Sequence, residues 1–256
     1  MKPSFVHLRV HSEYSLVDGV VRVKELAEAV VEKRMPAVAI TDVANFFALV
    51  KFYKAASNAG IKPIVASDIW VAPEKENEDP TPLVLVAKNE TGYRNLSELL
   101  SRAFTEGQVM GRATLRKDWI RAQSEGLLAL SAGKDGDVGK ALMGGNPETA
   151  EALTQDWLSI FHGDFYLELH RTGRAGEEDY IYHAVELALK LDCAVVATND
   201  VRFIKREEFE AHEVRVCIHD SRTLDDPRRE RRYSEEQYLK STDEMIALFS
   251  DLPEAI

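Results

Sequence analysis

Short apolar segments alternate with longer amphipathic segments along most of this chain. The short segments are rich in β-branched residues, as buried strands are, and the longer ones repeat apolar residues with a helical period. Because a strand–helix–strand unit returns the chain to the same edge of a sheet, this alternation predicts a parallel α/β fold. We predict strands at 5–10, 37–41, 62–66 with 69–71, 83–87, 127–131, 165–169 and 194–198, and helices at 21–33, 48–58, 91–103, 147–161, 177–191 and 207–218.

Polar residues end or follow several of the predicted strands. Seven strands of this kind suit a closed or nearly closed barrel better than an open sheet, and the carboxyl ends of barrel strands form the face that carries the site. Asp and Asn also follow strands as turn formers and helix caps, so one such position alone decides nothing. The repetition of polar residues at the ends of several strands favours a shared cleft. The positions are Thr41-Asp42, Ser67-Asp68, Ser131 and Asn199-Asp200.

The first predicted strand carries polar residues in alternation, at His7, Arg9 and His11, and Asp18 follows a short loop later. Alternate residues of a strand point to one face, so we expect these three side chains together. Two histidines and an acid are typical of half a metal site. Arginine is a permanent cation and offers no lone pair to a metal. The segment therefore predicts the frame of a metalloenzyme site in which one ligand position is lost.

Composition limits the partners and the compartment. The formal net charge of −11 argues against autonomous, non-specific binding to nucleic acid. A short basic cluster at 228–232 indicates either a solvated turn or a contact with a partner. Cys193 and Cys217 lie in apolar runs and indicate buried thiols rather than a disulfide framework. The sequence shows no signal peptide and no apolar stretch of membrane-spanning length, so we expect a cytoplasmic protein.

We expect one domain over residues 1–256. Near its end, residues 241–249 begin with Ser-Thr-Asp-Glu, which predicts a capped helix. Pro253 then opens a further helix just before the last residue. We therefore expect the chain to be the amino-terminal fragment of a longer protein that ends near a domain boundary.

Four long segments carry a family resemblance: FVHLRVHSEYSLVDG, AVAITDVANFFALVKFYKAASNAGIKPIVASD, LVLVAKNETGYRNLSELL and VVATNDVRF. They are similar to the amino-terminal polymerase-and-histidinol-phosphatase (PHP) domain of bacterial DNA polymerase III alpha subunits of the proteobacterial type. The segments occur in the family's order over nearly the whole chain. The resemblance implies a distorted seven-stranded, TIM-like (β/α)7 barrel, the PHP fold, placed ahead of polymerase domains that this sequence does not contain.

In metal-binding members of that family, a set of histidines, acids and one cysteine holds the metal ions. Matched position by position, the resemblance leaves four residual ligand positions here: His11, Asp18, Asp68 and Asp200. The remaining positions hold residues that cannot ligate through a side chain: Arg9, Val43, Pro82, Gly133 and Arg202. We expect no cofactor beyond, at most, one weakly bound Zn²⁺, Mn²⁺ or Mg²⁺.

The two arginines are expected to take over the electrostatic role of the lost ions. Without ions, carboxylates in a partly dry pocket repel one another, and guanidinium groups can pair with them through forked hydrogen bonds. The expected partners of Arg9 and Arg202 are Asp18, Asp68 and Asp200. In the alternative arrangement, the arginines point outward and bind phosphate. Asp42 is expected at the same cleft, in an ion pair or a phosphate contact.

The resemblance implies a part in DNA replication. The parent family is a DNA-directed DNA polymerase, a nucleotidyltransferase, but we expect this chain to be inactive alone. Its expected role is a structural scaffold and a binding platform for the proofreading exonuclease subunit, with only weak binding to DNA by itself. One alternative is a residual metal-dependent phosphoesterase or pyrophosphatase in the same cleft, which needs a metal to activate water. A free-standing phosphatase of histidinol-phosphate type is the other alternative.

Overall fold

The computed structural model describes residues 5–73, 78–109 and 111–256. Within these residues the strands are Ala37–Ile40 (β1), Lys62–Val71 (β2), Thr81–Ala87 (β3), Gln108–Val109 (β4), Arg112–Leu115 (β5), Leu127–Leu130 (β6), Phe165–His170 (β7) and Val195–Thr198 (β8). The helices are Val23–Glu32 (α1), Leu49–Asn58 (α2), Glu90–Thr105 (α3), Lys117–Ala122 (α4), Asp137–Met143 (α5), Pro147–Ile160 (α6), Glu177–Leu191 (α7), Phe209–His219 (α8) and Thr242–Leu248 (α9). The predicted strands and helices are thus largely confirmed, with β4, β5, α4 and α5 in addition.

Local sequence signals set several helix starts. The side chain of Asn89 accepts a hydrogen bond from the Gly92 backbone and caps α3. Ser241 and Glu244 form the predicted capping box at α9, each side chain bonding to the other residue's backbone N–H. The expected helix at Pro253 is a short 3₁₀ turn, Pro253–Ala255. These caps satisfy backbone groups that the first turn of a helix leaves unpaired.

The sheet is mixed rather than parallel. Its hydrogen-bonded order is β4-β5-β2-β3-β6-β7-β8, and β1 also pairs with β2. β1 and β5 run parallel to β2, and β7 runs parallel to both β6 and β8. β3 is antiparallel to both β2 and β6, so the prediction of a parallel sheet is wrong at this strand. The connection explains the reversal, because residues 72–80 are too few for a crossover, which needs about a dozen residues or more.

The first predicted strand, residues 5–10, is an extended segment that is bridged to Val201 at Val10. On one side, the Thr41 N–H donates to the Val10 carbonyl at 2.8 Å. On the other side, the His11 N–H donates to the Val201 carbonyl at 2.8 Å, just beyond β8. The segment therefore lies between β1 and the chain that follows β8. This is the place that the first strand of the expected barrel would take.

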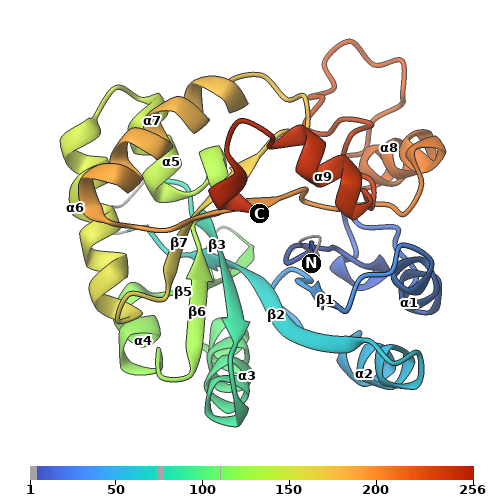
Figure 1. Cartoon of the computed structure of the whole chain (residues 1–256), viewed down its shortest axis with the longest axis horizontal. Helices are drawn as coiled ribbons and strands as arrows, with labels where there is room; N and C mark the ends of the chain where they lie inside the picture. Colours follow the sequence, from blue (N-terminus) through green and yellow to red (C-terminus); the bar gives the residue numbers. More distant parts are fainter. Residues whose placement is uncertain (1–4, 74–77, 110) are drawn as a thin grey trace.

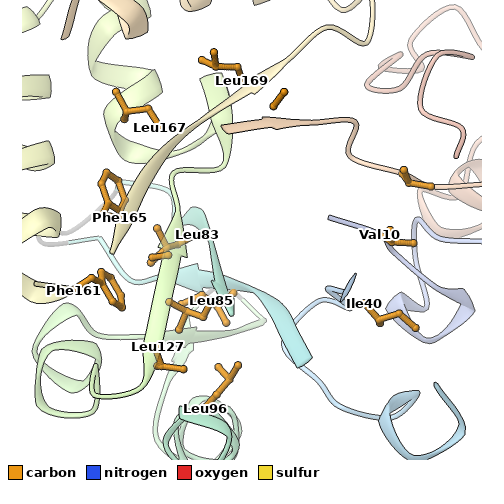
Figure 2. Close-up of a cluster of buried hydrophobic side chains, with 14 of the residues drawn as sticks. Val10, Ile40, Leu83, Leu85, Leu96, Leu127, Phe161, Phe165, Leu167 and Leu169 are labelled. Atoms are coloured by element: carbon orange, nitrogen blue, oxygen red, sulfur yellow. The ribbon is translucent and has the colours of Figure 1, made fainter. Parts of the chain in front are cut away.

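Both faces of the strands are buried. Leu83 and Leu85 of β3 belong to the larger apolar core, which also takes Leu96 from α3 (Figure 2). Val84 and Val86 belong to a smaller cluster with residues of β1, β2 and β6. Because successive residues of a strand point to opposite faces, the two clusters lie on opposite sides of β3. Burial on both sides explains why this strand is a continuous apolar run.

Helices lie around the outside of the strands, and α8 and α9 lie near the side where residues 5–11 run (Figure 1). The expected α/β class is confirmed. Asp42 and Asp200 follow β1 and β8 closely, as predicted, whereas β2 continues past Asp68 to Val71. Asp68 is therefore an inner residue of β2, where it bridges to Val43. No helix in the described part of the chain has the length and apolar character needed to cross a membrane.

Candidate functional site

Arg9 lies at the centre of a buried charged cluster. Its Nη2 is 2.6 Å from Asp68 Oδ2, its Nη1 is 3.1 Å from Glu168 Oε2, and its Nε is 3.4 Å from Asp200 Oδ1. These acids come from β2, from β7 and from the turn after β8. Arg9 is 5% exposed and Glu168 is fully buried. One guanidinium thus joins three separate parts of the sheet in a place with little water.

Arg202 extends the cluster. Its Nη2 donates to Asp200 Oδ1 at 2.8 Å, and its Nη1 lies 2.5 Å from Asp18 Oδ2. Asp200 Oδ1 is therefore shared by both arginines. The guanidinium groups face carboxylates, as in the first of the two expected arrangements. A buried carboxylate held by two guanidinium groups is far more strongly neutralised than a surface ion pair.

His11 lies between two of the same acids. Its Nε2 is 3.4 Å from both Asp68 Oδ2 and Asp200 Oδ1, and its Nδ1 is 3.2 Å from the Ser15 hydroxyl. Burial and the charge of Arg202 oppose protonation of the ring, but its hydrogen bonds with the two acids outweigh them and raise the pKa of His11. The structure thus brings together all four residual ligand positions, with two arginines among them.

The arginines also decide the charge state of the acids. Burial alone would raise the pKa of each carboxyl group, because it penalises the charged form. Arg202 and Arg9 outweigh burial and hold the pKa of Asp200 well below its usual range. Arg202 likewise lowers the pKa of Asp18, and Arg9 lowers that of Glu168 to about 2. These three acids are therefore ionised at neutral pH and bind the arginines as carboxylates.

Glu168 is the main residue that the sequence reasoning missed. It accepts a hydrogen bond from the Thr198 hydroxyl at 2.5 Å and lies 3.1 Å from His170 Nε2, in addition to its contact with Arg9. The family ligand positions gave no reason to single it out. One signal was present, because an acid inside the apolar strand Phe165–His170 needs a buried partner.

His170 also explains the glycine at one lost ligand position. A Cβ built on Gly133 would lie 2.6 Å from His170 Nδ1, and Gly133 has a φ of +61°. A side chain at position 133 would therefore clash with the imidazole and strain the backbone. The space that a side chain at position 133 would need is filled by the buried His170.

Two residues of the predicted cleft have other roles. Asp42 accepts hydrogen bonds from the backbone and hydroxyl of Ser12, both at 2.7 Å, and from the Ser15 hydroxyl at 2.8 Å. These bonds hold the turn after residue 11, so the Asp42 carboxylate anchors a turn instead of pairing with an arginine. His7 Nε2 donates to the Lys240 carbonyl at 2.8 Å and does not join Arg9 and His11. His7 is therefore a buried histidine whose ring is hydrogen-bonded to the backbone.

The short basic cluster at 228–232 is largely neutralised by nearby acids. Arg228 pairs with Asp226, Arg229 pairs with Glu213, and Arg232 pairs with Asp220. Such pairs leave little free positive charge for phosphate groups. The surface geometry of this loop therefore fits the solvated-turn interpretation better than a nucleic-acid contact.

The cluster does not fit a metal ion. In residues 5–73, 78–109 and 111–256, no group of three or more His, Cys, Asp or Glu side chains is arranged to hold one. The carboxylates that could bind a cation already face a guanidinium nitrogen at 2.5 to 3.4 Å. A divalent ion at the same carboxylates would lie beside two permanent positive charges. The carboxylates of this cluster are thus arranged around guanidinium groups.

Comparison with known proteins identifies related chains. Residues 7–172 match the family model described as the PHP domain. The chain is 56% identical over 256 residues to DNA polymerase III subunit alpha of Pseudomonas aeruginosa, covering 100% of this chain and 22% of that protein. It is 47% identical over 255 residues to DNA polymerase III subunit alpha of Escherichia coli K12, again covering 100% of this chain and 22% of that protein. The chain thus spans 22% of the length of these curated relatives.

Two solved structures share the fold. One is a putative metal-dependent phosphoesterase from Bifidobacterium adolescentis, with a TM-score of 0.50, 12% identity, and coverage of 77% of this chain and 87% of that chain. The other is an amidohydrolase from Chromobacterium violaceum with bound sulfate and no metal, with a TM-score of 0.51, 12% identity, and coverage of 82% and 96%. At this identity the likeness concerns the fold alone.

Proposed function

We propose, from the premise that this chain belongs to the PHP domain family, that it is a non-catalytic scaffold domain of a replicative DNA polymerase III alpha subunit. In this proposal it works in the cytoplasm, needs no cofactor, supports the remaining polymerase domains and binds the proofreading exonuclease subunit. The similarity to alpha subunits over the whole chain supports the link to replication. The polymerase activity itself is proposed for the parts of the relatives that lie outside this chain.

The observation that carries the scaffold proposal is the position of Arg9. A hydrolytic site of this family would need a metal to lower the pKa of an attacking water. Here Arg9 contacts Asp68, Glu168 and Asp200, so the carboxylates that would hold a metal bind a guanidinium instead. Arginine has no acceptor lone pair and stays protonated, so it cannot generate hydroxide. The cluster is suited to holding strands together rather than to activating water.

The alternative, a residual phosphoesterase or pyrophosphatase, finds less support in this geometry. It requires Arg9 and Arg202 to grip phosphate oxygens. Both guanidinium groups instead face carboxylates, and Arg9 and Arg202 are 5% and 6% exposed. Phosphate would have to displace several buried ion pairs, each of which would be costly to break.

Metal analysis tests the scaffold proposal. After dialysis into metal-free buffer, the purified chain is expected to carry well under one equivalent of zinc, manganese or magnesium by elemental analysis. Added chelator is expected to leave the melting temperature unchanged. Only a metal ion bound to the folded state would add to its stability, and the proposal expects none. A metal-binding PHP phosphoesterase dialysed in parallel is the control. Near-stoichiometric metal, or a chelator-induced fall in melting temperature, would contradict the proposal.

Exonuclease binding tests the partner role. The chain is expected to form a stoichiometric complex with the exonuclease subunit of its own replicase, measured by titration and by co-elution in size-exclusion chromatography. Labelled duplex DNA titrated under the same conditions is expected to bind much more weakly and to dissociate steeply with added salt. A folded protein of similar size and net charge serves as the control partner. Absence of a complex with the exonuclease would remove the binding-platform part of the proposal.

A further inference from the structure

Residues 233–240, called the strap here, run along the charged cluster. The Arg202 N–H donates to the Gln237 carbonyl at 2.9 Å, and the Leu239 N–H donates to the Phe203 carbonyl at 3.1 Å. Asn199 adds two side-chain hydrogen bonds, from Nδ2 to the Glu236 and Tyr238 carbonyls at 2.8 and 2.7 Å. The strap is therefore held along the turn after β8, beside both Asp200 and Arg202.

Two strap side chains reach the cluster itself. Gln237 Nε2 donates to Asp200 Oδ2 at 2.8 Å, and the Tyr233 hydroxyl donates to Asp18 Oδ2 at 2.9 Å. Gln237 is fully buried. The Tyr233 ring lies under the Arg202 guanidinium, 5.3 Å from its centre, in a cation–π contact. Arg202 is thus enclosed by its carboxylates on one side and by the strap on the other.

The strap supplies a hydrogen-bond donor to a carboxylate oxygen that the arginines do not contact. Both arginines use Asp200 Oδ1, and Gln237 uses the second oxygen of the same carboxylate. Asp18 Oδ2 is shared between Arg202 and Tyr233. Donors on both oxygens stabilise a buried carboxylate, because an unpaired buried polar atom costs free energy, and Asp200 has them whereas Asp18 does not. Gln237 therefore occupies a donor position that solvent or a ligand would otherwise fill, and Tyr233 adds a second donor to the Asp18 oxygen that Arg202 contacts.

We propose that the strap is a hinged cover over Arg202, and that small molecules reach this guanidinium only when the strap lifts. The strap is attached to the rest of the chain by the exposed loop at 222–232 on one side and by α9 on the other. Leu239 is buried in the apolar core and anchors the far end of the strap. From Tyr233 to Gln237 the contacts with the cluster are mainly hydrogen bonds, so this part can lift without unfolding the sheet. The inference builds on the proposed metal-free site and adds a control on access to it.

Arginine labelling tests the cover. Phenylglyoxal, which reacts with exposed guanidinium groups, is applied to the full chain, and modified residues are located by mass spectrometry. In the unmodified sequence, Arg202 is expected to react at least about tenfold more slowly than the exposed Arg231. The double variant Tyr233→Phe, Gln237→Leu is expected to raise the Arg202 rate at least about tenfold, the expected effect of losing even one of its two hydrogen bonds to a charged group. Arg202 that reacts like Arg231 in the unmodified chain would overturn the proposal.

The matched control is Tyr238→Phe. Tyr238 belongs to the strap, but its hydroxyl donates to Glu244 at 2.6 Å, outside the cluster, so its loss should leave Arg202 protected. Reactivity of the buried Cys193 thiol reports global unfolding in every sample. An unchanged Arg202 rate in the double variant, or Arg202 and Cys193 rates that rise together, would refute a local cover.

Hydrogen exchange on the unmodified chain keeps the proposal testable if the double variant does not fold. Backbone amides of the strap are expected to exchange before those of β7 and β8, because a cover opens in a smaller unit than the sheet. Strap amides that exchange only together with β7 would overturn the proposal. Metal content is measured on the same samples. A metal-loaded protein whose strap still opens locally would defeat the scaffold function and leave the cover intact.

Discussion

Replacing Arg9 with alanine is expected to lower the free energy of unfolding by about 3–5 kcal/mol, which is typical of removing one partner from a buried ion pair. Three buried carboxylates lose their shared guanidinium in this variant, and they then repel one another. For a chain of this length, the change corresponds to a fall in melting temperature of about 10 °C. Thermal unfolding and urea titration at pH 7 measure both quantities.

Two further variants test whether the loss of stability is specific to the buried cluster or follows the removal of any arginine. Arg94→Ala breaks an exposed pair with Glu90 on α3, and it is expected to change stability by less than about 0.5 kcal/mol. Adding Glu168→Gln to Arg9→Ala removes one of the unpaired charges and should recover part of the loss, as a double-mutant cycle would show. An Arg9→Ala protein with an unchanged melting temperature would mean that the cluster is not structural.

Acidification is expected to destabilise the protein in two stages, of which the first involves buried histidines. Burial lowers the pKa of His7 from 6.5 to about 4, so the unfolded chain takes up this proton first as the pH falls. The stability that neutral His7 contributes is complete above pH 6.5 and is lost as the pH falls to about 4, a change of about 3 kcal/mol. Burial lowers the pKa of His212 to about 4 as well, with the same sign.

The second stage involves the cluster carboxylates. Despite its burial, Glu168 has a pKa lowered from 4.5 to about 2 by Arg9, so its contribution is present above pH 4.5 and is lost as the pH falls toward 2. Asp200 and Asp18, whose pKa values are also lowered, act in the same direction. His11 acts in the opposite direction, because a raised pKa gives stability that is lost as the pH rises. Burial raises the pKa values of Asp42 and Asp137, so these acids also oppose the fall in stability. A net fall is expected because the opposing groups are fewer than the three carboxylates and two histidines that act together.

Urea unfolding midpoints measured from pH 8 to pH 3 test the predicted fall in stability on acidification. The midpoint is expected to fall continuously below pH 6.5. His7→Gln keeps a hydrogen-bond donor for the Lys240 carbonyl without a titrating ring, so it should flatten the curve between pH 6.5 and 4. A midpoint that stays constant or rises between pH 7 and 4 would show that these histidines are not buried in their neutral form.

Sequence patterns predicted the elements well and their pairing less well. The predicted helix at 177–191 has the observed bounds of α7, because its apolar residues repeat with a helical period and its acids fill the first turn. The antiparallel direction of β3 was not predicted, because the strand–helix alternation was applied to every strand. The short connection before β3, which favours a reversal, was not taken into account. β4 and β5 have two and four residues, too few for periodicity to mark them.

The candidate site shows the same limit. Arg9, Arg202 and their three expected acids were found because they occupy positions of a family motif. Glu168 was missed because it lies outside that motif, and Tyr233 and Gln237 were missed because they follow Asp18 and Asp200 by many residues and meet them only in the fold. Hydrogen bonds of this kind have no local sequence signature. In similar chains, an acid inside an apolar strand is the sequence signal that indicates a buried partner of this kind.

The sharing of Asp200 by two arginines has a consequence for any attempt to build a metal site here. Substituting a metal ligand for Arg9 alone would free Asp68 and Glu168 while Arg202 still occupied Asp200. A ligand placed at Gly133 would first have to displace His170. Each single substitution therefore removes structural contacts before any ion can bind, and a metal site would need several changes together. Because these residues share partners, the effects of such substitutions would not add independently, and a metal-binding variant would have to change them as a group.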